Sequence, residues 1–127
     1  MVYILEVSSP DTPNFRRIIH IDANHTFEDL HQIIQNSCDF DQSQLASFYV
    51  NDGKGKNLKE IGALDSAEAT PKTPSIQKTK LKDYINNEIG QKLIYVYDFF
   101  NELYFYIELK EKIMKTDLKE PFVAYKN

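Results

Sequence analysis

The stretch LIYVYDFFNELYFYIEL, residues 93–109, decides the fold and contains seven of the sixteen Phe and Tyr residues of the chain. On either side of a turn near residues 100–102, side chains alternate with a period of two, which is the pattern of two antiparallel strands. Both faces of the first strand are apolar or aromatic, so we expect it in the centre of a sheet. The second strand has one apolar face and one amphipathic face. The stretch therefore predicts a β-hairpin.

The residues before this hairpin predict three more strands and one helix. Residues 2–8 and 15–21 are rich in β-branched and aromatic side chains and are separated by a short turn with two prolines, and residues 47–50 resemble a further strand. Residues 26–38 predict an amphipathic helix, because Thr26 is a good N-cap, acidic residues fill the first turn and apolar residues recur at helical spacing.

The remaining segments are less regular. Residues 57–62 predict one helical turn, residues 62–79 a long mobile loop, residues 81–90 a short helix and residues 111–127 a polar, Lys-rich tail. The sequence thus predicts one α+β domain over residues 1–127. Its sheet is mixed and mostly antiparallel, with one main amphipathic helix across it, in the order β-β-α-β-loop-α-β-β.

Composition limits the compartment and the class of protein. The chain has 127 residues, is 42% hydrophobic and 27% charged, and contains a single cysteine, Cys38. A disulfide framework and a four-thiolate zinc site are excluded, and a reducing compartment is expected. The first residues, MVYILEV, do not resemble a signal peptide, and no apolar run approaches the roughly 18 residues of a membrane span. We expect a cytoplasmic protein that does not associate with membranes.

Charge argues against nucleic acid as the main partner. The chain carries a net charge of −4, because a basic segment of +4 at residues 54–82 is outweighed by −6 at residues 1–53 and smaller contributions elsewhere. Phosphate neutralisation supplies most nucleic-acid affinity, so an acidic chain is a poor candidate. The hairpin aromatics could stack on bases, but Asp98, Glu102 and Glu108 among them would repel phosphate. Core packing and cross-strand pairing explain these rings better.

Motifs for catalysis and metal binding are incomplete. Glu28 and His31 have the spacing of helical metal ligands, but the second pair that such sites need is missing. Residues 39–44, DFDQSQ, begin like a calcium loop but lack its glycine and its final glutamate, and GKGK at 53–56 lacks the spacing of a phosphate loop. Cys38 lies on the apolar stripe of the helix, as a buried structural cysteine does. We expect no enzymatic activity, no cofactor and no metal.

Three segments in order resemble a known family. They are FRRIIHIDANHTFEDLHQIIQ at 15–35, DFDQSQLASFYV at 39–50 and LIYVYDF at 93–99. With its Asp-Leu-His element at residues 29–31 and its Tyr-x-Tyr-Asp-Phe element at residues 95–99, the chain resembles the plasmid pRiA4b ORF-three-like family, whose members are also labelled as transposable-element passenger proteins. The resemblance implies a bacterial setting and an α+β fold, and it brings no established biochemical activity.

The chain departs from the family pattern where polar groups could converge. The family's His-Leu-His is Gln44-Leu45-Ala46 here, and its Gly-Asp-x-Trp-x-His becomes the stretch from Phe100 to Phe105. Potential ligands for a metal or substrate are lost and aromatic side chains are gained. Because Tyr and Phe are enriched in interface cores, we interpret the chain as a non-enzymatic module that binds another protein or itself.

Two alternatives remain. The first is a small-molecule or metal binder with a degenerate pocket around His31 and Asp98, joined by Asp41. The second is a nucleic-acid-associated protein of mobile elements. The candidate binding surface consists of Arg16, Arg17, His31, Asp41, Tyr95, Tyr97, Asp98, Phe100, Tyr104 and Tyr106.

Overall fold

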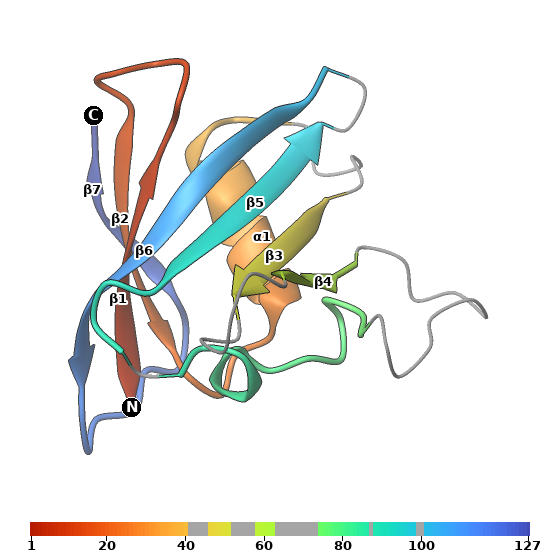
Figure 1. Ribbon diagram of the computed structural model, residues 1–127. Helices are drawn as coiled ribbons and strands as arrows, with labels where there is room; N and C mark the ends of the chain where they lie inside the picture. Colours follow the sequence, from red (N-terminus) through yellow and green to blue (C-terminus); the bar gives the residue numbers. More distant parts are fainter. Residues whose placement is uncertain (41–45, 52–57, 63–73, 87, 99–100) are drawn as a thin grey trace.

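The computed structural model describes residues 1–40, 46–51, 58–62, 74–86, 88–98 and 101–127, and it contains one seven-stranded sheet (Figure 1). The strands are β1 (Val2–Ser8), β2 (Arg16–Asp22), β3 (Ser47–Asn51), β4 (Leu58–Ile61), β5 (Lys92–Asp98), β6 (Leu103–Ile113) and β7 (Phe122–Lys126). Their order in the sheet is β4-β3-β5-β6-β1-β2-β7, and each neighbouring pair is antiparallel.

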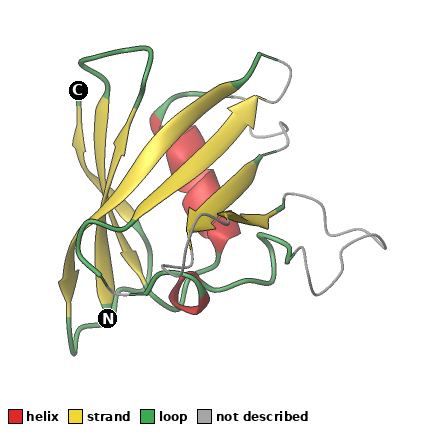
Figure 2. Cartoon of the chain, in the orientation of Figure 1, coloured by secondary structure: helices red, strands yellow, loops and turns green. Residues whose placement is uncertain are grey.

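One helix, α1 (Phe27–Ser37), crosses one face of the sheet (Figure 2). Its expected N-cap is confirmed as a capping box, in which the Thr26 hydroxyl accepts the Asp29 N–H at 3.2 Å and the Asp29 carboxylate accepts the Thr26 N–H at 3.1 Å. Two further N–H groups of the first turn, which have no partner within a helix, donate to the backbone oxygens of Ile76 and Thr79. The helix start is therefore fixed by its own cap and by the segment that precedes β5.

The core lies between α1 and the sheet. Phe27, Leu30 and Ile34 on the helix are fully buried, as the predicted apolar stripe requires. They pack with alternate residues of the strands, because successive side chains of a strand point to opposite faces. The buried strand residues include Tyr3, Leu5, Val7, Ile19, Ile21, Phe48, Val50, Ile61, Leu93, Tyr95, Phe105, Ile107 and Leu109.

The hairpin prediction for residues 93–109 is confirmed. Strands β5 and β6 pair antiparallel, and β5 lies inside the sheet between β3 and β6. Tyr95 faces Phe105 on the covered side, while Val96 faces Tyr104 on the opposite side. The register shifts once, between Val96 and Asp98, which interrupts the alternation near the end of β5.

The predicted fold class is wrong. The chain is not an α+β domain with two helices and a mixed sheet, but a seven-stranded antiparallel sheet with one helix. Residues 58–61 form strand β4 in place of the expected helical turn, since they pair with β3 from Phe48 to Asn51. Strand β7 is a further strand that the predicted order lacks.

The helix expected at residues 81–90 is only a 3₁₀ turn, η1 (Leu81–Asp83). Asn86 explains why the turn does not continue, because its side chain accepts the N–H of Glu88 and its own N–H donates to the Gln91 side chain. Asparagine competes with helical hydrogen bonds in this way. The helical spacing of Leu81 and Ile85 only places both side chains in the core.

Residues 111–127, expected to be a polar tail, contain the end of β6 and all of β7. Two register shifts interrupt the alternation of apolar and polar side chains by which these strands could be predicted. One shift lies between β1 and β6 at Ile4 and Leu5, and the other lies between β2 and β7 at Ile18 and Ile19. A bulge adds one residue to one strand, so the alternation of apolar side chains changes phase.

The loop expected at residues 62–79 lies partly outside the described residues, which omit 63–73. The described part is ordered by the core: Ile76 is buried, and Gly62 pairs with Ser75 in a parallel bridge. Gly62 donates to the Pro74 oxygen at 2.9 Å and accepts from the Ile76 N–H at 2.8 Å. Hydrogen bonds thus hold Gly62 next to residues 74–76, on the two sides of residues 63–73.

Candidate functional site

The uncovered face of the sheet carries a cluster of rings and aliphatic side chains that we call the tyrosine patch. It consists of Tyr49, Ile94, Val96, Tyr104 and Tyr106 on the neighbouring strands β3, β5 and β6. Ile94 lies between Tyr49 and Tyr106 in register, and Tyr106 is 40% exposed. The rings of Tyr104 and Tyr106 meet edge to face with centroids 5.5 Å apart, and their hydrogen bond raises the pKa of the Tyr104 hydroxyl. No described helix covers this face (Figure 2).

Two carboxylates beside the tyrosine patch, Glu6 and Glu108, are paired with cations on the same face. Glu6 and Glu108 lie opposite each other on β1 and β6, an unfavourable arrangement for like charges. Each has its own cation: Arg16 Nε donates to Glu6 at 2.7 Å, and Lys110 Nζ donates to Glu108 at 3.0 Å. These hydrogen bonds raise the pKa of both cations. The face therefore alternates apolar patches with locally neutralised charge.

Two predicted site residues, His31 and Tyr95, form a buried polar network under α1. The Tyr95 hydroxyl accepts from Gln35 Nε2 at 2.7 Å and lies 2.6 Å from His31 Nδ1. The hydroxyl can then donate its own proton to Nδ1 of a neutral His31 that carries its proton on Nε2. Burial lowers the pKa of His31 and raises that of Tyr95, which fits this assignment. This network fixes the helix on the sheet.

A hollow of about 340 Å³, which we call the arginine pocket, lies among the β1–β2 turn, the residues that follow α1 and the β5–β6 hairpin. Phe15 and Phe105 stack at 4.6 Å, Tyr97 lies 4.5 Å from Phe105, and Phe40 lies 5.3 Å from Tyr97, all between ring centroids. The lining residues are Ser9, Asp11, Thr12, Phe15, Arg17, Cys38, Phe40, Tyr97, Leu103 and Phe105.

Arg17 supplies the pocket's buried charge and is only 6% exposed. Its guanidinium lies 4.3 Å from the centroid of the Phe15 ring, a cation–π contact. Nη1 donates to the Arg16 backbone oxygen at 3.0 Å and to the backbone and side-chain oxygens of Asn127, each at 3.1 Å. Nε is buried and has no hydrogen-bond partner among the described residues. Burial raises the pKa of the neighbouring Cys38 thiol, which is therefore uncharged.

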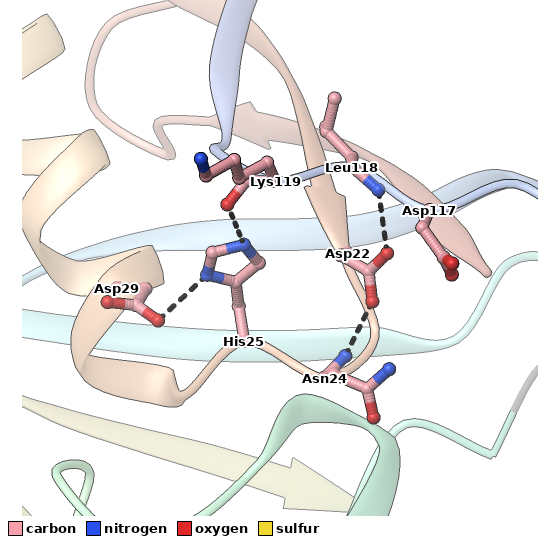
Figure 3. Close-up of a pocket in the computed structure, with 7 residues that line it drawn as sticks. All are labelled: Asp22, Asn24, His25, Asp29, Asp117, Leu118 and Lys119. Atoms are coloured by element: carbon pink, nitrogen blue, oxygen red, sulfur yellow. Dashed lines mark hydrogen bonds and ion pairs between the residues drawn. The ribbon is translucent and has the colours of Figure 1, made fainter.

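A larger hollow of about 460 Å³, the histidine pocket, opens beside the start of α1 (Figure 3). His25 Nδ1 contacts the Asp29 carboxylate at 2.9 Å, and Nε2 contacts the Lys119 backbone oxygen at 3.1 Å. Both partners are acceptors, so both contacts are hydrogen bonds only when both ring nitrogens carry a proton. The histidine ring thus links α1 to the connection between β6 and β7.

Asp22, which is buried in the wall of the same pocket, anchors that connection as well (Figure 3). Its carboxylate accepts the N–H groups of Asn24 and Leu118, each at 2.9 Å. Burial raises the pKa of Asp22, but these donors outweigh burial and the net pKa is lowered. Two of the four contacts drawn in Figure 3, His25 to Lys119 and Asp22 to Leu118, join the β6–β7 connection to the residues before α1, and the other two are local. We therefore assign these polar groups a structural role.

The structure does not bring the predicted site residues into one cluster. Arg16, Tyr104 and Tyr106 lie on the uncovered face, whereas Arg17 and Tyr97 line the arginine pocket. Asp98 closes the β5–β6 turn, where it accepts the backbone N–H and the side-chain amide of Asn101. Asp41 and Phe100 lie outside the described residues.

The pocket expected around His31 and Asp98 is not formed by these two residues. His31 is bonded to Tyr95 beneath α1, while Asp98 is committed to its turn. The described part of the chain contains no group of three or more His, Cys, Asp or Glu residues that could hold a metal ion. It also contains no helix that combines the length and the hydropathy of a membrane crossing.

Sequence reasoning missed Phe15, Phe40 and Cys38 as neighbours of Arg17 in one pocket. Part of the signal was present, since Phe15 and Arg17 are two residues apart on a predicted strand and share a face. The contributions of Phe40 and Cys38 depend on where the chain leaves α1, which the local pattern does not encode.

Comparison with known proteins supports the resemblance noted in the sequence and extends it. A model of the plasmid pRiA4b ORF-3-like protein family matches residues 2–125. No curated protein matches the chain. Among solved structures, the chain is similar to the crystal structure of a protein of unknown function, MM3350 from Methanosarcina mazei Go1. That match has a TM-score of 0.75 and 25% identity, and it covers 98% of this chain and 68% of the other. Since the family match spans nearly the whole chain, the protein belongs to the plasmid pRiA4b ORF-3-like family, which is uncharacterised.

Proposed function

We propose that this chain is a non-enzymatic protein-interaction domain that docks through its tyrosine patch, and that a second copy of the chain is the occupant. The observation that supports the proposal most is the contiguous row of Tyr49, Ile94 and Tyr106 on a sheet face without a covering helix among the described elements. Tyrosine is enriched in interface cores because it buries a large ring and keeps a hydroxyl that can reach water or a partner.

The charges on this face favour a second copy as the partner. The whole chain carries −4, so two copies repel each other at long range. Near the patch, however, Glu6 and Glu108 are paired with Arg16 and Lys110. Two such faces can therefore meet without unpaired carboxylates at Glu6 and Glu108, and the apolar centre gains from burial.

Light scattering on a sizing column tests this proposal. Wild-type protein, run over a series of concentrations, should show a mass that rises toward that of a dimer. The double variant Tyr104→Ser, Tyr106→Ser should remain monomeric at the same concentrations, because it removes both rings that β6 contributes to the patch.

Ile89→Ser is the matched control, since Ile89 is 58% exposed and lies before β5, outside the sheet. It removes exposed apolar surface elsewhere and should dimerise like the wild type. A wild type that is monomeric at every concentration, or a control that loses the dimer together with the double variant, would contradict the proposal.

A further inference from the structure

We propose that His25 is a proton-dependent clasp, which holds the β6–β7 connection against the start of α1 when its ring is protonated and releases it when the ring is neutral. The clasp consists of the two contacts that the ring nitrogens make, to the Asp29 carboxylate at 2.9 Å and to the Lys119 backbone oxygen at 3.1 Å (Figure 3). The histidine pocket around it shares no residue with the tyrosine patch, so the inference does not depend on the proposed interaction function.

The first argument is that both partners of the ring are hydrogen-bond acceptors. A carboxylate and a backbone carbonyl have no proton to donate, whereas a neutral imidazole has one N–H and one lone pair. The protonated ring therefore donates to both partners, and a neutral ring turns its lone pair toward the oxygen of one of them. Hydrogen bonds to ionised groups are the stronger ones, so the neutral ring keeps its proton on Nδ1 for Asp29 and loses the contact with Lys119.

The second argument is the charge around the ring, which favours the protonated form. The lining of the histidine pocket contains one lysine and three carboxylates, on Lys119, Asp22, Asp29 and Asp117. The charged groups on the other segments that neighbour residues 22–29 and the connection cancel in sign, and they are the Met1 ammonium, Lys80, Lys82, Glu28, Asp83 and Glu120. The carboxylates of the lining therefore leave an excess of negative charge, which attracts an imidazolium.

The third argument is that the two carboxylates closest to the clasp remain ionised. Burial raises the pKa of Asp29, but the hydrogen bonds from His25 and from the Thr26 N–H outweigh burial and the net pKa is lowered. The net pKa of Asp22 is lowered as well, and its carboxylate keeps the Leu118 N–H at 2.9 Å. Deprotonation of His25 thus removes one attachment of the connection and leaves the bond between Asp22 and Leu118 in place.

The clasp controls the edge of the sheet, because the connection leads into β7. This strand is the last in the order of the sheet, and its pairing with β2 is interrupted by a register shift between Ile18 and Ile19. When β7 separates, β2 becomes the edge strand, and its N–H and C=O groups become available to another strand. A rise in pH should therefore favour opening of this edge, and a fall in pH should favour its closure.

Hydrogen exchange followed by mass spectrometry tests the clasp on the wild-type protein. It is measured at about pH 5.5 and about pH 8, because histidine side chains titrate over this range. Each rate is divided by the intrinsic rate at the same pH, so that only protection is compared. Peptides that cover residues 118–126 should lose protection about tenfold at the higher pH, the effect of one charge-assisted hydrogen bond. Peptides from β3 and β5 should not lose protection at the higher pH.

Two variants locate the effect. His25→Gln removes the charge and keeps a side chain that can donate to one partner, so residues 118–126 should have the low protection of the pH 8 wild type at both pH values. His31→Gln is the matched control and should keep the wild-type difference, since His31 is bonded to Tyr95 beneath α1. The α-amino group of Met1 is present in all three proteins, so any contribution it makes is the same in each.

The ring itself provides a second readout that needs no variant. Carbon-13 chemical shifts of the histidine rings follow the protonation of each ring in the wild type, and the loss of protection at residues 118–126 should follow the titration of His25. Equal protection of these residues at the two pH values would overturn the proposal. A difference that persists in His25→Gln, or one that follows the titration of another histidine, would overturn it as well.

Discussion

The two faces of the sheet use the same residue type in different ways. On the covered face, the Tyr95 ring is fully buried and its hydroxyl is shared between Gln35 and His31. On the uncovered face, Tyr104 and Tyr106 contact each other and the solvent. All three lie on one hairpin, so the difference arises from the helix and not from the local sequence. Tyrosine on the covered face is part of the core, whereas Tyr106 on the other face is 40% exposed.

The largest difference in stability between the two faces is expected for substitutions at two adjacent residues of β1, which point to opposite faces. Leu5 is fully buried under α1, and Ile4 is half-buried on the uncovered face. Leu5→Ala should lower the free energy of unfolding by about 2–5 kcal/mol, because it leaves a cavity. Ile4→Ala should cost only about 1 kcal/mol, as for an average substitution.

Urea denaturation of both variants measures this difference. Equal losses would show that a further element covers the second face in solution, and the comparison between the faces would then fail. A concentration-dependent loss for Ile4→Ala would instead indicate that self-association contributes to stability.

A smaller effect is expected when the Tyr95 hydroxyl is removed. Tyr95→Phe leaves Gln35 Nε2 without an acceptor and His31 Nδ1 without a donor, and both are buried. The expected loss is about 1–3 kcal/mol, the desolvation cost of unsatisfied groups. Tyr106→Phe, on the other face, should leave thermal unfolding unchanged within error. Equal shifts in melting temperature for the two variants would contradict the assignment of Tyr95 to the fold.

The smallest effect concerns pH. Burial lowers the pKa of His31 below its ordinary value of 6.5, so the unfolded state takes up a proton on this group before the folded state does. Stability should therefore fall as the pH is lowered from about 6.5 toward the folded-state pKa, by at most about 1.4 kcal/mol for each pH unit. Urea denaturation at several pH values gives the free energy of unfolding as a function of pH. Its slope against pH should be shallower for His31→Gln than for the wild type. Parallel curves for the variant and the wild type would contradict the prediction, because they would show that folding does not shift the pKa of His31.

Sequence reasoning recovered the elements with strong local signals. The N-cap at Thr26 and the period-two hairpin at 93–109 both depend on residues close together in the chain, and both are observed. It failed where tertiary contacts override local preference. Leu81 and Ile85 have helical spacing, but the hydrogen bonds of Asn86 end the helical turn. Strand β7 was missed because a bulge opposite Ile18 and Ile19 interrupts its alternating pattern.

The candidate sites were harder to predict from the sequence than the fold. The sequence identifies the hairpin rings but does not assign each ring to one face of the sheet, because the first strand is apolar on both faces. The pairing of Arg17 with Phe15 follows from strand alternation. That Phe40 lines the same pocket as Arg17 depends on how the chain turns after α1, which is a property of the packed molecule.

The parallel bridge between Gly62 and Ser75 has a practical consequence for engineering. Two hydrogen bonds hold Gly62 beside Pro74 and Ile76, and the entropy of closing a longer connection between two fixed ends grows slowly with length. A foreign peptide or a reporter domain could therefore be spliced in between these anchor points while the sheet retains its register. The same geometry would allow relatives to differ in length at this position and still share the scaffold.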